Sequence, residues 1–280
     1  MEEHQLILTP TIEERILRLR RAQEIKVINK AQAQAAAVPF RDDQWMSGPP
    51  SCSAADFETP RLRRCLFDPA TINWKFSSRV DGGLDGYVWK VWFGADGPYA
   101  LKVMIETAVQ KAAIAATPIL VNANPRTKDE ALANLRTFSN EGRELHLSTE
   151  GSEVKAISST PRIRKCYGWL NLSGQVFREL PMKLKPPNLR VGKIHRAMST
   201  KKEYIAIVYE YVEEGENRWD AVEEVDNFFW LAGFGHNFSP AARNWRSGVL
   251  VDPSDIIHAG GYGWRPKRYG PRTANMLLRA

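Results

Sequence analysis

The sequence predicts an α+β protein, because short apolar strand patterns and amphipathic helical patterns occupy separate stretches of the chain. From residue 66 onward, apolar runs alternate with turns rich in glycine and aspartate, which is typical of strands. Helical spacing of apolar residues is visible at 128–148 and 220–235. Of the 280 residues, 43% are hydrophobic and 25% are charged, a composition typical of a globular protein with a sizeable core.

The composition also argues against several classes of protein. No run of apolar residues approaches the roughly 18 that a membrane span requires, and the acidic start MEEHQLILTP lacks the features of a signal peptide. Cys52, Cys65 and Cys166 are too few and too scattered for a disulfide framework or a zinc site. We therefore expect an intracellular protein, nuclear or cytoplasmic, with no membrane partner.

Two segments precede the strand-rich part of the chain. Residues 1–38 predict a helix, since Thr11 and Glu14 have the spacing of a capping box and Pro39 marks the end. Residues 39–65 are rich in proline, serine and aspartate and predict a flexible linker. Neither segment carries a pattern that indicates chemistry.

The strand-rich part begins with short apolar runs at 72–76, 87–93 and 98–105. The last two are separated by GADG, whose Asp96–Gly97 step is a strong hairpin signal, so we expect adjacent antiparallel strands. The patterns that follow predict a helix at 128–148, strands at 162–170 and 203–212, a helix at 220–235 and a strand-like run at 248–256.

The loop before the 87–93 strand suggests a phosphate-binding site. Gly83 and Gly86 let the backbone approach a bound phosphate closely, because glycine has no side chain to intervene. Lys102 lies among apolar residues on the next strand and can reach back over the sheet toward the same phosphates. An ammonium group inside a fold requires a carboxylate partner, which we expect from the helix that follows.

These features resemble the protein-kinase fold over about residues 72–255. The glycine-loop signature G-x-G-x-x-G-x-V is matched at Gly83, Gly86 and Val88, with Asp81 where the first glycine belongs. The resemblance implies an antiparallel-sheet N-lobe with an αC-type helix over 66–212. An abbreviated helical C-lobe with a basic tail would follow over 213–280.

Three further stretches carry the same resemblance. The motif YALK is similar to the kinase strand V-A-I-K, which implies nucleotide contacts from Ala100 and Lys102. The stretch SNEGRELHL resembles the start of the αC helix and implies that Glu141 pairs with Lys102. The stretch IAIVYEYVEEGE resembles the strand and hinge that receive adenine, and it puts Glu210 and Val212 on the hinge.

The second half departs from the kinase pattern. Asn244 and Asp252 fit the metal-binding pair, and Asp252 opens Asp-Pro-Ser where Asp-Phe-Gly is expected. Ser239 stands where the catalytic aspartate belongs, and no Asp or Glu lies between Asp226 and Asp252. The resemblance therefore implies binding of ATP and Mg²⁺ without a carboxylate base. His236 is the one substitute base, although a histidine of the core is the simpler interpretation.

A narrower resemblance is to a fungal kinase-like family labelled as a kinetochore Sim-four complex subunit, the Fta-two domain. The stretches similar to it are DGGLDGYVWKVWFGADGPYALKV, FFWLAGFG and RNWRSGVLVDPSDI. This resemblance implies a fungal source and a kinase-like fold, and the label itself suggests an association with the kinetochore.

The net charge of +7 is concentrated in one segment. Residues 171–202 contain eight lysines and arginines and a single acid, Glu179. Pro181, Pro186 and Pro187 predict that this insertion is extended, with its cations spaced along it. It is either a solvated loop or a surface for an acidic protein partner. Nucleic acid is the weaker partner, bound without sequence specificity, because Phe177 is the only aromatic residue available for stacking on bases.

The sequence thus favours a pseudokinase or scaffold that can bind ATP and Mg²⁺ without efficient phosphoryl transfer. The alternatives are an active atypical small kinase that works without a carboxylate base, and a basic binding module for an acidic partner or nucleic acid. The kinase-like interpretation expects Lys102 to approach Glu141, with Glu144 as the second choice, and expects Asp252 to face the same cleft. A Glu141 on the solvent side of its helix would remove the kinase-like interpretation, whatever the glycine loop looks like.

Overall fold

The computed structural model describes residues 40–48, 52–54, 62–82, 86–104, 119–146, 153–191, 194–236 and 241–279. The chain divides into two compact units, Met1–Pro39 and Phe40–Ala280, and every described residue belongs to the second. The helix predicted at 1–38, the loop residue Gly83 and Ser239 therefore lie outside the described residues.

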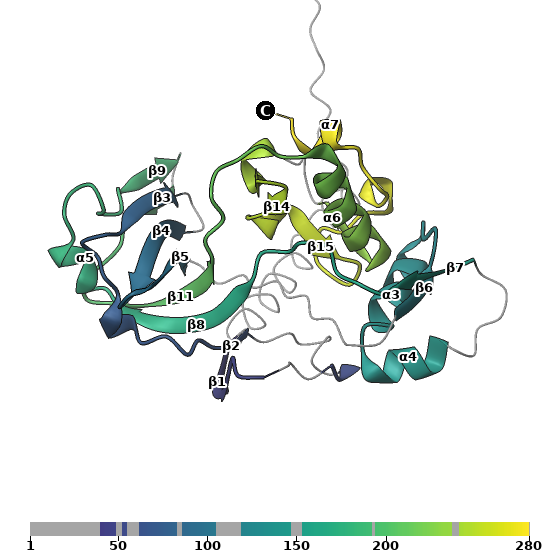
Figure 1. The fold of residues 1–280 in the computed structure, drawn as a ribbon, viewed down its shortest axis with the longest axis horizontal. Coiled ribbons are helices and arrows are strands. Elements are labelled where there is room, and N and C mark those ends of the chain that lie inside the picture. Colours follow the sequence, from purple (N-terminus) through teal and green to yellow (C-terminus); the bar gives the residue numbers. More distant parts are fainter. Residues whose placement is uncertain are drawn as a thin grey trace, which may run out of the picture. The chain divides into compact units, whose positions relative to one another are not determined.

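The described part of the chain is α+β, as predicted, with a mixed seven-stranded sheet and five helices. Its strands follow one another across the sheet as in Figure 1, in the order β1 (Phe40–Trp45), β2 (Leu62–Arg64), β8 (Cys166–Ser173), β11 (Glu203–Glu210), β5 (Asp96–Met104), β4 (Gly86–Phe93) and β3 (Ser78–Gly82). All neighbours from β8 to β3 are antiparallel, but β1–β2 and β2–β8 are parallel.

Two corrections follow from this order. The sheet is not purely antiparallel, because β1 and β2 extend it in parallel. Both strands come from the 39–65 segment, so that segment is not a flexible linker throughout. Its backbone is held by hydrogen bonds to the sheet, such as the 2.7 Å bond from the Cys65 amide to the Trp169 carbonyl.

The hairpin predicted from the Asp96–Gly97 step is confirmed by β4 and β5, which pair from Gly86↔Met104 to Phe93↔Asp96 with a shift of register between Val91 and Phe93. Burial alternates along β4, with Tyr87, Trp89, Val91 and Phe93 on the covered face. Residues that pair directly across antiparallel strands share a face. Val88 and its partner Lys102 therefore lie on the opposite face, together with Ala100.

The insertion at 171–202 covers the buried face of this hairpin instead of extending into solvent. It contains the short helix α5 (Val176–Glu179), and its side chains Phe177, Leu180 and Leu184 join the same core as Trp89. The Trp89 indole stacks on Phe177, with ring centroids 5.7 Å apart, and donates a 2.9 Å hydrogen bond to the Leu184 carbonyl. The extended loop predicted from the prolines is therefore wrong, because burial of Phe177, Leu180 and Leu184 folds the insertion onto the sheet. A small hairpin, β9 (Leu189–Val191) and β10 (Ile194–Arg196), ends it.

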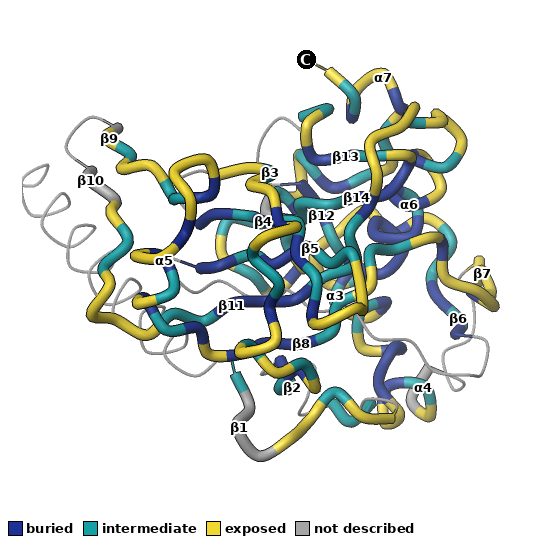
Figure 2. The backbone as a smooth tube through the Cα atoms, turned by 60° about the vertical axis from the view of Figure 1, so that its left-hand side comes forward, coloured by how far each residue is buried: buried dark blue, intermediate teal, exposed yellow. Residues whose placement is uncertain are grey.

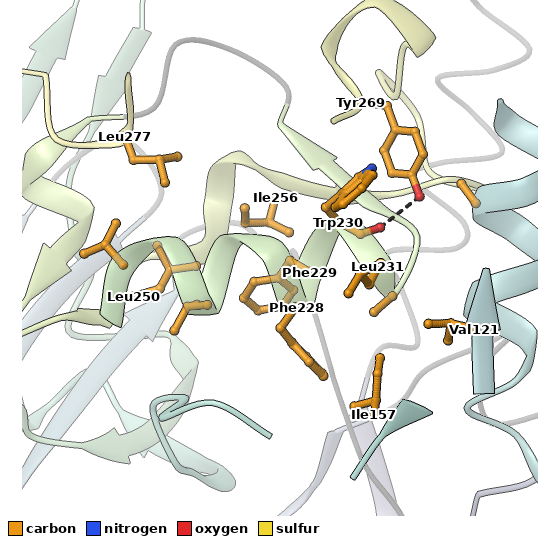
Figure 3. Packing of buried hydrophobic residues seen from close by; sticks show 14 of the residues in the cluster. Val121, Ile157, Phe228, Phe229, Trp230, Leu231, Leu250, Ile256, Tyr269 and Leu277 are labelled. Carbon is orange, nitrogen blue, oxygen red and sulfur yellow. Dashed lines mark hydrogen bonds between the residues drawn. The ribbon is translucent and has the colours of Figure 1, made fainter. Parts of the chain in front are cut away.

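A second core surrounds α6 (Trp219–Leu231), the helix predicted at 220–235. Figure 3 shows Phe228, Phe229 and Trp230 projecting from this helix into the cluster, which also receives Leu277 from α7 (Ala274–Leu277). The Tyr269 hydroxyl donates a 2.8 Å hydrogen bond to the Trp230 carbonyl and satisfies a polar group near the end of the helix. In Figure 2, the buried backbone is concentrated in α6 and in the central strands of the sheet. None of the described helices combines the length and apolarity needed to cross a membrane.

The helix predicted at 128–148 is two helices, α3 (Lys128–Arg136) and α4 (Asn140–His146), joined by a turn. Together with the antiparallel pair of β6 (Ile119–Asn122) and β7 (Val154–Ile157), they pack with the core of α6 and not with the sheet. Buried Asn134 fixes this packing, since its Nδ2 donates to the Leu231 carbonyl at 2.9 Å and to the Asn122 carbonyl at 3.0 Å. Gly233, at φ +84°, allows the close approach, because a Cβ there would lie 2.2 Å from the Ala131 carbonyl oxygen.

Short hairpins complete the C-terminal part. β12 (Phe234–His236) pairs with β15 (Ile256–His258), and between them β13 (Trp245–Arg246) pairs with β14 (Val249–Leu250). Ser247 at φ +49° and Gly248 at φ +74° close the inner hairpin. This nesting brings Asn244, just before β13, next to the residues that follow β14.

Candidate functional site

A cavity lies where the Lys102 face of the sheet meets the β13–β14 hairpin. The sheet contributes the apolar residues Val80, Val88 and Ala100 to its lining, together with Asp81 and Lys102. Val212, which follows the last residue of β11, borders the same space. Below the sheet, Asn244 and Asp252 line the cavity from the two ends of the hairpin. Residues from distant parts of the sequence thus form one polar site with an apolar wall.

Several residues predicted from the sequence do line this one cavity: Val88, Ala100, Lys102, Val212, Asn244 and Asp252. Gly86, Glu141 and Glu210 are not among the residues that line it. Gly86 starts β4, where a Cβ would lie 2.3 Å from the Val103 carbonyl oxygen, so strand packing alone accounts for this glycine. The Glu210 carboxylate is hydrogen-bonded to Arg162 instead.

The central polar contact joins Lys102 to Asp252, whose Nζ and Oδ1 atoms are 3.6 Å apart. The side chains are 20% and 42% exposed, so both reach solvent from within the cavity. The backbone positions Asp252, because the amides of Val251 and Asp252 donate to the Asn244 carbonyl at 2.8 and 3.3 Å. The Asn244 side chain in turn donates a 2.9 Å hydrogen bond to Asp255.

Glu141 is not the partner of Lys102, so this prediction is wrong. Its carboxylate is exposed and accepts a 2.8 Å hydrogen bond from the Ala54 amide. The cause is the packing of α3 and α4, since Asn134 holds α3 against the end of α6 and leaves α4 with the second core. Glu144, the second choice, is exposed on the same helix. Among the described residues, Lys102 forms its ion pair with Asp252 from the opposite side of the cavity.

Arg164 is a site residue that the sequence analysis missed. Its Nε donates a 3.0 Å hydrogen bond to the Glu210 carbonyl, and its Nη1 donates a 2.5 Å bond to the Val251 carbonyl. The guanidinium also lies 4.4 Å from the centre of the Tyr209 ring. Arg164 therefore ties the end of β11 to the hairpin that carries Asp252. These partners are 46 and 87 residues away in the sequence, so no local pattern marks the residue.

Burial and charge act on two ionisable groups beside the cavity. Burial lowers the pKa of Arg164, although an arginine remains charged throughout the physiological range. Burial of Glu210 disfavours its ionised form, but hydrogen bonds from Arg162 and from the Lys165 amide outweigh that effect and lower the pKa of Glu210. Both groups are therefore charged near neutral pH.

His236 belongs to the core and does not line the cavity. Its Nε2 atom lies 2.7 Å from Asp226 Oδ1, and both side chains are almost fully buried. The other Asp226 oxygen accepts a 2.8 Å hydrogen bond from the Arg272 amide. His236 therefore holds α6 to β12 and is not positioned as a base for a ligand beside Lys102.

Comparison of this chain with protein-family models, with curated proteins and with solved structures finds no match. The site is therefore interpreted from its own geometry and from general chemistry.

We expect Arg164→Met to destabilise the protein by about 2 kcal/mol, because it leaves two partly buried carbonyls without their charged donor. Arg162→Met is the matched control. Arg162 pairs with the Glu210 carboxylate but is 55% exposed, and an exposed ion pair contributes less than about 1 kcal/mol. Urea unfolding with an unchanged denaturant slope measures both free energies of unfolding. Equal losses in the two variants would show that Arg164 does not join the cavity walls.

Proposed function

We propose that this protein binds a nucleotide in this cavity and does not transfer phosphoryl groups efficiently. The observation that carries the proposal is the Lys102–Asp252 pair, 3.6 Å apart, beneath the apolar wall of the cavity. A lysine on a strand of the sheet and an Asn and Asp below it are the groups that protein kinases use around the phosphates of ATP. A concave site that combines apolar side chains with a few convergent polar groups is a common form of ligand site.

The order of the elements supports the same proposal. The lysine strand β5 lies between β4, which follows the glycine loop, and β11, which leads to Val212 at the cavity edge. Asn244 and Asp252 bracket a short hairpin and meet at its base. In a kinase-like fold, these are the relations expected between the phosphate lysine, the hinge and the two polar residues below the nucleotide.

Two departures argue against efficient catalysis. Active protein kinases require the ion pair between the phosphate lysine and the αC glutamate, whereas Glu141 lies elsewhere and faces solvent. The sequence also has no Asp or Glu between Asp226 and Asp252, so a carboxylate base is missing from this stretch. The exposed Glu141 meets the condition that removes the kinase-like interpretation. The proposal is therefore limited to nucleotide binding, and it rests on the cavity and on the order of the strands around it.

An active atypical kinase is the second candidate. Phosphoryl transfer depends mainly on positioning and on stabilisation of charge, and the lining of the cavity supplies several cations. We rank this function below nucleotide binding alone, because the residues that the structure describes include neither the lysine–glutamate pair nor a carboxylate base to orient the reacting groups.

We expect ATP at 100 times its dissociation constant to stabilise the protein by about 2.7 kcal/mol, measured as a rise in the unfolding midpoint. Lys102→Met should abolish that rise while changing the stability of the free protein by less than about 1 kcal/mol, because its ion pair is partly exposed. Lys155→Met, an exposed lysine on β7, removes the same charge elsewhere and should leave the rise intact. Transfer of labelled phosphate to casein should stay at background.

Two results would contradict these expectations in different ways. The absence of any ATP-dependent stabilisation, or its survival in Lys102→Met, would refute nucleotide binding at this cavity. Phosphate transfer at ordinary kinase rates that is lost in Asp252→Ala would keep the site but establish the active-kinase alternative.

The basic insertion, residues 171–202, supports a further function that is separate from the cavity: contact with an acidic protein partner. Arg178, Lys183 and Arg190 are exposed on a segment that is itself anchored to the sheet, so their charges are held in place. Phe177, the aromatic residue that could stack on bases, is buried against Trp89. The surface therefore suits carboxylates or other anions and lacks the aromatic platform of a single-strand-binding protein.

We expect the triple variant Arg178→Gln, Lys183→Gln and Arg190→Gln to lose most of the binding to polyglutamate that the wild type shows. The wild type should bind duplex DNA more weakly than polyglutamate, with an affinity that falls steeply as salt rises. The control is Lys128→Gln, Lys155→Gln and Lys267→Gln, which removes three exposed charges elsewhere. Fluorescence anisotropy at two salt concentrations measures the binding of each protein to polyglutamate and to duplex DNA. Identical binding by the two triple variants would make the insertion an ordinary solvated surface.

A further inference from the structure

We propose that the cavity neutralises the phosphates of its ligand with arginine and lysine side chains in place of Mg²⁺, so that the metal-free nucleotide is the form that binds. This inference rests on the proposed nucleotide-binding function. It replaces the sequence-based expectation that Asn244 and Asp252 hold a metal ion.

Cations dominate the lining of the cavity. Four cationic side chains border it, Lys102, Arg164, Arg243 and Arg246, against the two carboxylates Asp81 and Asp252. Lys102 and Arg164 come from the sheet side, and Arg243 and Arg246 come from the hairpin side. A ligand between these walls therefore meets positive charge from both sides.

The donors near Asp252 do not fit Mg²⁺ well. This ion requires about six oxygen ligands in near-octahedral geometry and usually draws one or two carboxylates from the protein. The Asp252 carboxylate is already paired with the Lys102 ammonium at 3.6 Å, and Arg164 is close enough for Asp252 to act on its charge. Asp255, the nearby acid, accepts the side-chain hydrogen bond of Asn244. In the described part of the chain, no group of three His, Cys, Asp or Glu side chains could hold a metal ion.

Arg164 is fixed where an anion can use it. Two backbone carbonyls, those of Glu210 and Val251, hold its guanidinium on the cavity wall. A guanidinium has five N–H donors, so these two bonds leave donors for a ligand. Because the group is already oriented, its binding to a phosphate requires little further ordering, which favours affinity.

Arg243 is exposed, and the Arg246 side chain is 22% exposed. Arg246 Nη1 is 3.6 Å from Glu214 Oε2, but the Glu214 side chain is 84% exposed, so this rim pair is readily exchanged for a stronger one. Arginine binds phosphate in a bidentate manner and is suited to replace a metal ion as counter-charge. A metal-free triphosphate is more negative than its magnesium complex and so complements a cationic lining better.

The experiment measures binding of ATP and of inorganic tripolyphosphate to the full chain by calorimetry, in EDTA and in excess Mg²⁺ at equal ionic strength. We expect both ligands to bind about tenfold more tightly in EDTA. The variant Arg243→Gln and Arg246→Gln should lose most of that advantage. Arg265→Gln and Arg279→Gln, which removes two exposed charges outside the cavity, should keep it.

The effect of Asp252→Asn on nucleotide affinity distinguishes phosphate binding by cations from phosphate binding through Mg²⁺. If cations hold the phosphates, removal of this carboxylate strengthens metal-free binding, because it removes a repulsion and frees Lys102. If Asp252 coordinates Mg²⁺, the same substitution abolishes the metal-dependent binding. Mg²⁺-dependent binding that Asp252→Asn removes would overturn this inference and leave the proposed function intact. A lack of binding in both buffers would overturn the proposed function, and the inference with it.

Discussion

The hydrogen bonds of Arg164 hold together the two walls of the cavity. The Arg164 guanidinium lies between the Glu210 carbonyl, at the end of β11, and the Val251 carbonyl, just before Asp252. A guanidinium inside a protein is costly unless it has polar partners, and here two carbonyls accept from two of its donors while the Tyr209 ring lies against it. The position of Asp252 relative to Lys102 depends on this bridge, because Asp252 is attached to the hairpin and Lys102 to the sheet.

The second constraint is the packing of α3 on α6. Buried Asn134 bonds to the Leu231 carbonyl and to the backbone of β6, so the helix expected beside the sheet belongs to the other core. Lys102 thereby has no carboxylate from this helix. It is paired instead with the residue that follows the β13–β14 hairpin. The expected partner of Lys102 was Glu141 on the αC-type helix. The observed partner, Asp252, lies across the cavity.

The sequence predicts those features that depend on local patterns. The β4–β5 hairpin follows from Asp96–Gly97, and α6 follows from its apolar spacing. Short sequence motifs also identified six residues that line the cavity: Val88, Ala100, Lys102, Val212, Asn244 and Asp252.

The features that the sequence did not predict depend on contacts between distant residues. The packing of α3 on α6 depends on the bond between Asn134 and Leu231, which are 97 residues apart. The folded insertion depends on Trp89 and Leu184, which are 95 residues apart. In both cases tertiary burial outweighs the local signal, since the prolines of the insertion predicted an extended chain.

Covalent labelling tests most directly whether the phosphates of a nucleotide lie beside Lys102. An acyl-phosphate derivative of ATP transfers its acyl group to a lysine amine that lies next to the bound phosphates, and peptide mass spectrometry locates the modified residue. We predict acylation of Lys102 that excess ATP or tripolyphosphate prevents, whereas Lys155 reacts slowly and without protection. Labelling of Lys102 no faster than that of Lys155, and unaffected by either competitor, would contradict the assignment of this cavity as a phosphate-binding site.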